Sequence, residues 1–265
     1  MSGMEEHLFQ KLEERRLRGN LRKLPKEKDG IDLCSNDYLG LARSADLHNA
    51  IAERISELGI PNGSTGSRLL TGNSFEHEKL EARLAEFFNG DDSLLFNSGY
   101  SANMAVISSL TTRGDLILFD ELSHASLRDG LRLSFADSQR FKHNDLAHLK
   151  ELLEEADVSR NKWIVVESVY SMDGDICDLN PLVEVAEEFG AWIIVDEAHS
   201  TGIYGKGGNG LVNELGLQDR IHVRTYTFGK GPGIHGACVV GSKTLKDYLI
   251  NFARGFIYTL SLIHI

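Results

Sequence analysis

The sequence predicts an α/β protein, a three-layer sandwich built on a mostly parallel sheet of seven strands. Two observations lead to this prediction. From about residue 46 onward, short apolar runs alternate with helix-length amphipathic segments, which is the pattern of strands joined by crossover helices. Several runs, such as KWIVVES and AWIIVDE, are apolar almost throughout, as expected for strands that helices cover on both faces.

The N-terminal segment is predicted to be helical. Residues 5–24 carry leucines at helical spacing among charges of both signs, and the turn KEKDGID ends the pattern. The turn-rich stretch LCSNDYLGLA follows. Residues 1–45 are therefore interpreted as an N-terminal helix with a connecting segment.

Residues 46–259 are predicted to form the domain that holds the sheet. Two helices, LHNAIAERISELG and SFEHEKLEARLAEFFN, precede the strands. The connections contain further helical patterns, such as DLAHLKELLEEA and LNPLVEVAEEFG. The seven strands are expected, in order, at SLLFN, DLILFD, QRFKH, KWIVVES, AWIIVDE, HVRTYTF and GACVVGS.

Composition argues against several classes of partner. The chain has 39 acidic and 28 basic side chains and a net charge of −11, whereas nucleic-acid binding needs a basic face. No segment approaches the ~20 apolar residues of a membrane span, and the N-terminus lacks a signal peptide's apolar run. The three cysteines have no zinc-site spacing, so we expect reduced, buried thiols, no metal and a cytoplasmic location.

Chemically active residue types follow the predicted strands. Because ligands in such sheets bind beyond the carboxyl ends of the strands, we expect these residues to gather at one edge. The segments after successive strands are SGYSAN, ELSHAS, VYSMDGD, DEAHSTG and GKGPG.

A lysine and a carboxylate at two neighbouring strand ends, Lys230 and Asp196, indicate pyridoxal 5′-phosphate (PLP) chemistry. The lysine would form an imine with the cofactor aldehyde, and the carboxylate would keep the ring nitrogen protonated. His199 could bond the phenolic oxygen of the ring. Gly99 and Tyr100 open a predicted helix, and their amides could meet the phosphate.

Taken singly, these residues have simpler explanations. His124 is typical of a core or helix-cap histidine, and Gly99 of a residue that turns the chain. Ser171 is typical of a turn, and Thr227 of a strand. Only their shared position at the strand ends favours a site.

Two motifs that would indicate other functions fit the sequence less well. GxGxxG patterns begin at Gly205 and Gly231, but neither stands between a strand and the start of a helix as a dinucleotide site requires. VDEAH resembles the acidic box of DEAH-type NTPases, yet both GK pairs, at Lys206 and Lys230, are followed by glycine. No GxxxxGK[ST] phosphate loop is therefore present.

Seven motifs, in order along almost the whole chain, resemble the α-oxoamine synthase family. The resemblance implies the fold of aspartate aminotransferase (fold type I) and a homodimer with the active site at the subunit interface. The motifs are SNDYLGL (35–41), GSTGSRLLTGN (63–73), FNSGYSAN (96–103), DELSHASLRDG (120–130), SVYSMDGD (168–175), VDEAHSTG (195–202) and TFGKG (227–231).

The resemblance implies catalytic roles for four of the matched residues. Lys230 would carry the cofactor imine and move protons, and Asp196 would pair with the pyridinium nitrogen. His199 would bond the phenolic oxygen. His124 would stack on the ring and orient the carboxylate of the amino acid.

Five further residues are implied in binding. Ser171 and Thr227 would hydrogen-bond the cofactor, and Gly99 and Tyr100 would hold its phosphate region. Arg22, in NLRKLP, matches a position that contacts the acyl substrate. A solvated helix charge is the alternative interpretation of Arg22.

The implied reaction is the decarboxylative condensation of L-alanine with a pimeloyl thioester, carried on CoA or on a carrier protein. SNDYLGL and GSRLLTGN look most like the biotin-biosynthesis members of the family. The alternative within the family is a different pair of substrates, such as glycine with acetyl-CoA. A DEAH-type NTPase is the distant alternative.

The sequence departs from the family in two places. Pro232 restricts φ and supplies no amide donor in the lysine loop. The family continues after FARGFIYT with a second domain of more than about 100 residues, so we expect a truncated chain that is unstable or inactive alone. Residues 260–265, LSLIHI, do not resemble the family and match a translated transposon end, so we expect a non-native tail.

Overall fold

The protein is represented by a computed structural model that describes residues 2–25 and 30–261. The chain divides into two compact units, residues 1–35 and residues 36–265. The proposed tail at 260–265 falls largely outside the described residues.

The first unit contains one helix, α1 (Gly3–Leu17). Ser2 caps it: its hydroxyl accepts from the Glu5 amide, and the Glu5 carboxylate accepts from the Ser2 amide. The expected helix to residue 24 is wrong in extent, because Arg18 closes the last turn and Gly19 takes the left-handed conformation with φ +69°.

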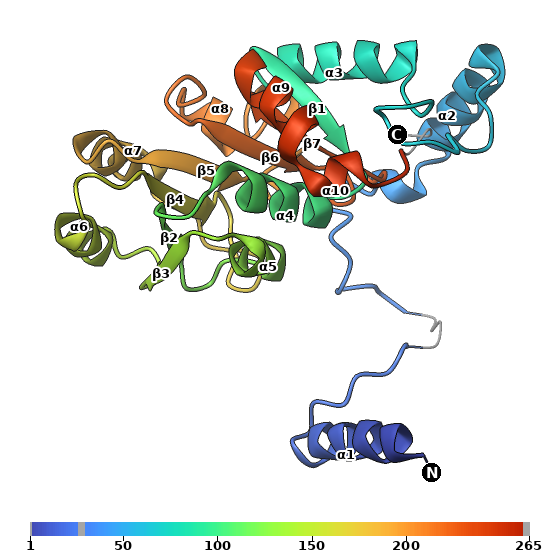
Figure 1. Cartoon of the computed structure of the whole chain (residues 1–265). Coiled ribbons are helices and arrows are strands. Elements are labelled where there is room, and N and C mark those ends of the chain that lie inside the picture. Colours follow the sequence, from blue (N-terminus) through green and yellow to red (C-terminus); the bar gives the residue numbers. More distant parts are fainter. Residues whose placement is uncertain (1, 26–29, 262–265) are drawn as a thin grey trace. The chain divides into compact units, whose positions relative to one another are not determined.

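The second unit is built on one sheet of seven strands in the order β1-β7-β6-β5-β4-β2-β3 (Figure 1). β7 runs antiparallel to both of its neighbours, β1 and β6, and the other pairs are parallel. The mostly parallel seven-stranded sheet is thus confirmed. The strands are β1 (Asp92–Phe96), β2 (Leu116–Asp120), β3 (Asp137–Phe141), β4 (Lys162–Glu167), β5 (Trp192–Asp196), β6 (Val223–Thr227) and β7 (Ala237–Gly241).

Helices cover both faces of this sheet, as the continuous apolar runs predicted. One face packs against α4 (Gly99–Leu110), α5 (Ala125–Leu133), α9 (Lys243–Phe252) and α10 (Arg254–Ile257). The other packs against α3 (Phe75–Phe87), α6 (Leu146–Glu155), α7 (Leu179–Glu188) and α8 (Leu211–Glu214). The remaining helices are η1 (Leu41–Arg43), α2 (Ala45–Leu58) and η2 (Lys206–Gly208).

The alternation of side chains along each strand explains the two cores. In β4, Ile164 and Val166 enter the core under α6 and α7, while Val165 enters the core under α4 and α5. All three are fully buried. A strand whose two faces are both covered has no polar face, which is why KWIVVE shows no alternation in sequence.

Two expectations about the surface can be compared with this fold. Cys177 and Cys238 are buried as expected, but Cys34 is exposed, so the expectation of buried thiols is wrong for Cys34. Among the described residues, no helix is long and apolar enough to cross a membrane.

Candidate active site

Three neighbouring strands bring acidic and hydroxyl side chains to one edge of the sheet. Glu167 ends β4 and lies in register with Asp196 at the end of β5. Asp196 pairs in turn with Thr225 of β6, two residues before Thr227. The loop after β6 then carries Lys230, so the convergence expected from sequence is present.

Lys230, His199 and Tyr38 form a hydrogen-bonded chain across this edge. The Lys230 Nζ lies 2.6 Å from His199 Nε2, and His199 Nδ1 lies 2.6 Å from the Tyr38 hydroxyl. Tyr38 donates its own proton to Asn36 Oδ1 at 3.1 Å. The phenol oxygen therefore accepts from Nδ1–H, and Nε2 is left to accept from the lysine amine.

Burial sets the charge of these groups. It lowers the pKa of His199 to about 4, and the Lys230 charge adds to the effect, so the imidazole is neutral near pH 7. Burial also lowers the pKa of Lys230, although the charges of Asp196 and Glu167 oppose this shift. A larger share of the lysine is therefore the neutral amine, which is the nucleophilic form.

Asp196 is held by two N–H donors. It is only 4% exposed, its Oδ1 accepts from the Ala198 amide at 2.9 Å, and its Oδ2 accepts from Asn103 Nδ2 at 2.6 Å. A buried carboxylate paired only with neutral donors can bind a cationic group.

His124 occupies the N-cap of α5. Its Nδ1 accepts from the Ser126 amide at 3.2 Å and lies 2.8 Å from the Ser126 hydroxyl. Its backbone amide donates to Glu167 Oε1 at 2.5 Å. Burial lowers the pKa of His124, although the Asp196 charge opposes this shift, and the Lys230 charge adds to the lowering.

The start of α4 supplies a positive helix end beside β6. A Cβ built on Gly99 would lie 2.0 Å from Thr227 Oγ1, so glycine allows the helix to begin against the strand end. The first amides of a helix have no partner within it and favour an anion. Tyr100 follows; its ring centroid lies 6.3 Å from that of His124, and its hydroxyl bonds Asp129.

One residue expected from sequence, Ser171, is not joined to the groups above by any contact within the described part of the chain. Ser171 is exposed in the loop after β4. Arg22 belongs to the first unit and is exposed there.

Sequence reasoning missed four residues that contact the cluster: Tyr38, Asn103, Ser126 and Glu167. Tyr38 lies in SNDYLGL and Asn103 in FNSGYSAN. Both were therefore inside motifs that already pointed to function. Their partners are far away in sequence, and no local pattern reports such contacts.

The contacts of the loop around Lys230 account for its Gly231 and Pro232. A Cβ on Gly231 would lie 2.4 Å from the Thr201 carbonyl oxygen, so this glycine lets two loops pass closely. The turn is closed by the Gly233 amide donating to the Lys230 carbonyl at 2.9 Å. None of the described hydrogen bonds of this turn requires an N–H at position 232.

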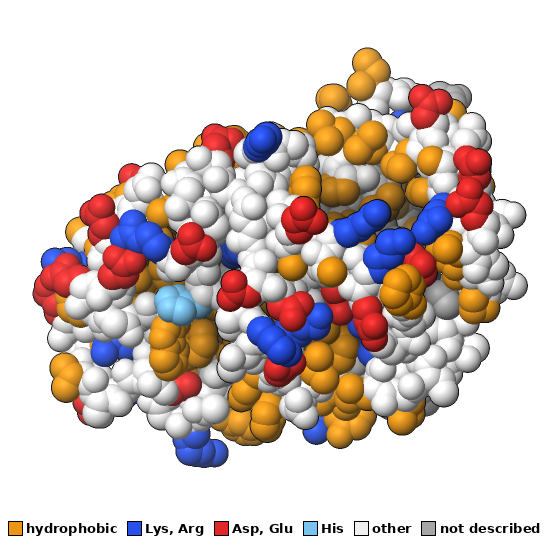
Figure 2. Space-filling model, turned by 90° about the horizontal axis from the view of Figure 1, so that it is seen from above, with side chains coloured by type: hydrophobic (Ala, Val, Ile, Leu, Met, Phe, Trp, Pro, Cys, Tyr) orange, Lys and Arg blue, Asp and Glu red, His pale blue; other side chains and the backbone are white. Residues whose placement is uncertain are grey.

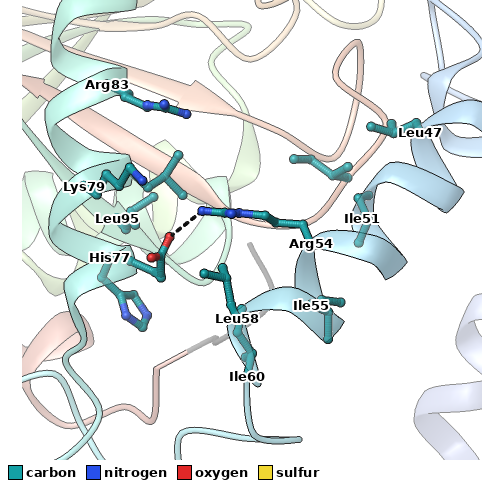
Figure 3. A pocket seen from close by; sticks show the side chains of 13 residues that line it. Leu47, Ile51, Arg54, Ile55, Leu58, Ile60, His77, Lys79, Arg83 and Leu95 are labelled. Atoms are coloured by element: carbon teal, nitrogen blue, oxygen red, sulfur yellow. Dashed lines mark ion pairs between the residues drawn. The ribbon is translucent and has the colours of Figure 1, made fainter.

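A separate pocket of about 470 Å³ lies between α2 and α3. Figure 3 shows aliphatic side chains of α2 facing α3, with Arg54 reaching across the gap to an acidic side chain; that ion pair joins Arg54 and Glu76 at 3.8 Å. None of the residues expected in the site from sequence lines this pocket.

Comparison with known proteins gives consistent relatives. A putative 8-amino-7-oxononanoate synthase of Halalkalibacterium halodurans is 45% identical over 232 residues, covering 88% of this chain and 58% of the relative. The structure of 8-amino-7-oxononanoate synthase from Francisella tularensis matches with a TM-score of 0.74 and 33% identity, covering 88% of this chain and 65% of that one.

A third match is the serine palmitoyltransferase of S. paucimobilis with a bound PLP–myriocin aldimine. It has a TM-score of 0.87 and 30% identity, and covers all of this chain and 72% of that one. These matches confirm the aspartate-aminotransferase-like fold and the resemblance to the α-oxoamine synthases. This chain spans about three fifths of the length of the first curated relatives it matches.

The aminotransferase class I and II family matches residues 28–265, which is most of the chain and includes every residue of the strand-end cluster. On that match, and on the cluster of lysine, carboxylate and histidines it contains, the chain belongs to the aminotransferase class I and II family.

Proposed function

We propose that the whole protein is a PLP-dependent acyltransferase. It would condense L-alanine with a pimeloyl thioester and release 8-amino-7-oxononanoate, CO2 and the free thiol. The observation that carries this proposal is the convergence of the Lys230 amine and the Asp196 carboxylate at one sheet edge, where the Asp196 charge opposes the lowering of the Lys230 pKa by burial. The names of the curated relatives support the choice of reaction.

The residues at the sheet edge fit PLP. Asp196 offers a buried carboxylate to a pyridinium nitrogen, and the first turn of α4 offers the positive end of a helix to a phosphate. Buried polar atoms without a protein partner, Asn103 Oδ1 and Ser123 Oγ, belong to residues beside Asp196 and His124. When bound, PLP supplies an aldehyde that condenses with amines and a ring that accepts the electron pair of a substrate carbanion.

The chain's own residues would bind and orient this group. Lys230 supplies a partly neutral amine, and its Nζ can take up and return a proton at the substrate's α-carbon. His199 stays neutral and directs Lys230 through Nε2. His124, beside the same charges, would hold the carboxylate of the amino acid.

The remaining binding roles stay proposals. Thr227 stands against Gly99 at the helix start, where both can reach a phosphate-bearing ligand, and Tyr100 follows at the same helix end. Ser171, exposed after β4, would close on the cofactor from the neighbouring strand end. Arg22 would contact the acyl substrate.

The assembly is part of the proposal. We place residues 46–259 as the PLP-binding domain of a cytoplasmic homodimer, with CoA or a carrier protein bringing the acyl group. Exposed apolar side chains before the sheet, including Leu69, Leu70 and Phe75, support an interface with a second subunit.

The test is exchange of the substrate's α-proton. The whole protein, loaded with PLP in deuterated water, is expected to exchange the α-proton of L-alanine at least tenfold faster than that of glycine or L-serine. NMR of the recovered amino acids measures this rate. The exchange measurement involves the amino acid alone, without an acyl substrate. Pimeloyl-CoA is then added to look for CO2 release.

D-alanine and the Lys230→Ala variant are the controls, and neither should exchange. Faster exchange of glycine or L-serine would replace the proposed substrate with that of another α-oxoamine synthase. A PLP-loaded whole protein that exchanges none of the three amino acids would contradict the proposal.

A further inference from the structure

His143, which follows β3, lies between two carboxylates from different parts of the chain. Its Nδ1 lies 2.9 Å from Asp120 Oδ1, at the end of β2, and its Nε2 lies 2.6 Å from Asp175 Oδ2, in the segment after β4. Asp120 is fully buried. The catalytic and binding roles proposed above do not involve this arrangement.

Asp175 belongs to a short hairpin, residues 168–177. Val169 and Ile176 pair across it, and its tip contains the exposed Ser171. The hairpin begins directly after the last residue of β4. It therefore leaves the sheet at the edge where the candidate active site lies.

The two contacts of His143 require two N–H donors. An ionised carboxylate only accepts, and a neutral imidazole has a single N–H, whereas the imidazolium has one for each acid. Asp120 also accepts from the Leu122 and Asn144 amides, and Asp175 Oδ2 from Asn144 Nδ2, so both acids act as acceptors. A neutral ring would place a nitrogen lone pair against one of them.

The surroundings favour the charged ring. Burial alone would lower the pKa of His143, but the hydrogen bonds to Asp120 and Asp175 outweigh burial, so the pKa is raised. Two other titratable groups face His143 within the described structure: the Glu121 carboxylate accepts from its amide at 3.1 Å, and the Tyr170 ring centroid lies 4.5 Å away. The titratable side chains of the adjoining segments that have no described hydrogen bond to the ring are Lys142, Asp145, His148, Asp173, Cys177 and Asp178.

We propose that His143 is a positioning residue: as an imidazolium it holds the 168–177 hairpin to the end of β2, and it loosens the hairpin when the ring loses its proton. The inference rests on the proposed function for its purpose, which is to keep Ser171 where it can reach the cofactor. The hold itself depends only on the charges of the ring and of Asp175.

The raised pKa of His143 gives the direction of the pH dependence. The stabilisation is complete below the pKa of an unfolded histidine, about 6.5, and is lost as pH rises through the raised folded pKa. Asn144 Nδ2 still donates to Asp175 and, at 3.3 Å, to the Ile176 carbonyl. Loss of the proton therefore loosens the hairpin without detaching it.

The first measurement is the titration midpoint of His143 in the whole protein without cofactor. Slow deuterium exchange at its ring carbon Cε1, read by mass spectrometry of peptides, follows the protonation of this one histidine. Asp175→Asn keeps an acceptor oxygen but removes the charge, so a lower midpoint than in wild type is expected. Asp173→Asn is the matched control, because it removes the same charge from the exposed tip of the hairpin and should leave the midpoint unchanged.

The second measurement is amide hydrogen exchange in the hairpin, where the Gly174 amide donates to the Tyr170 carbonyl at 2.9 Å. Its protection, relative to an unfolded chain at the same pH, is expected to fall about threefold or more between pH 6 and pH 8.5. His143→Gln should show the lower protection at both pH values. His148→Gln, which changes a histidine of α6, should keep the wild-type pH dependence.

Equal midpoints of His143 in wild type and Asp175→Asn would overturn the inference. An equal loss of protection with pH in wild type and His143→Gln would overturn it as well. Because both measurements are made without cofactor, failure of PLP binding in wild type would instead count against the proposed function.

Discussion

At the scale of single residues, two buried glutamates near the same edge differ in what their oxygens accept. Glu197 accepts from the Val212 amide on Oε1 at 2.7 Å and from the Leu211 amide on Oε2 at 3.1 Å. Glu167 accepts from the His124 amide on Oε1 alone among the described contacts. Burial, with the Asp196 charge, raises the pKa of Glu167 to about 8.

These contacts predict different effects on stability when each glutamate is replaced by glutamine. Glu197→Gln must turn an amide NH2 toward a backbone N–H, so we expect a loss of about 2–3 kcal/mol of unfolding free energy. Glu167→Gln keeps the acceptor for His124 and resembles the protonated acid, so a change below about 1 kcal/mol is expected near pH 4, where the acid is protonated in the folded chain and largely protonated in the unfolded chain. Urea unfolding of the two variants measures both.

The pH dependence follows from the sign of the Glu167 shift. A carboxyl whose folded pKa is raised stabilises the fold fully below its unfolded pKa, and this contribution is lost as pH rises toward about 8. Glu167→Gln should therefore gain stability relative to wild type between pH 5 and pH 8. Equal slopes for both chains across that range would show that Glu167 is ionised in the fold.

The sequence predicted those residues whose place follows from the end of a strand. Asp196 and Lys230 follow recognisable apolar strands, so their shared edge could be inferred. The contact from Tyr38 to His199 spans 161 residues and the one from Asn103 to Asp196 spans 93. Such pairs depend on how loops and helices pack, which no local pattern encodes.

At the scale of elements, the approach of α4 to β6 shapes the candidate phosphate site. Gly99 has ordinary φ, and the restriction is space alone, because Thr227 Oγ1 occupies the position of its missing Cβ. The helix can start this close to the strand only while position 99 lacks a side chain.

A double-mutant cycle tests this packing. Gly99→Ala is expected to cost about 1–3 kcal/mol of unfolding free energy in wild type, because the added methyl group must displace Thr227. In a Thr227→Ala background, where Oγ1 is gone, the same change should cost clearly less. Thermal unfolding of the four chains gives the coupling energy.

Gly63→Ala is the matched control, since nothing lies within 4 Å of a Cβ there and its φ is not positive. It should change stability by less than about 0.5 kcal/mol. Equal costs of Gly99→Ala in both backgrounds would mean that Thr227 does not limit position 99.

The elements themselves were largely predictable, and their arrangement was not. Each expected strand overlaps an observed one, because buried strands need continuous apolar runs. The insertion of β7 between β1 and β6 follows from long-range pairing. α1 ends at Leu17 because Gly19 stops it. The prediction of a longer helix gave more weight to the helical spacing of the leucines beyond Gly19.

At the scale of the whole molecule, the net charge of −11 is spread over a mixed surface. Figure 2 shows lysine and arginine side chains interspersed with acidic ones on the face seen from above, with hydrophobic side chains exposed among them. On this face side chains of both charge signs are mixed, and the exposed apolar side chains there support the proposed homodimer.

The most direct test of the central claim is to locate the lysine that links to PLP. The 265-residue chain is incubated with PLP, reduced with borohydride, digested and mapped by mass spectrometry. The account predicts a pyridoxyl group on Lys230, present in Lys206→Ala and absent from Lys230→Ala. Lys206 is the matched control, because it forms the other GK pair but is exposed in η2. A label on Lys206 or spread over surface lysines, with Lys230 unmodified, would contradict the account.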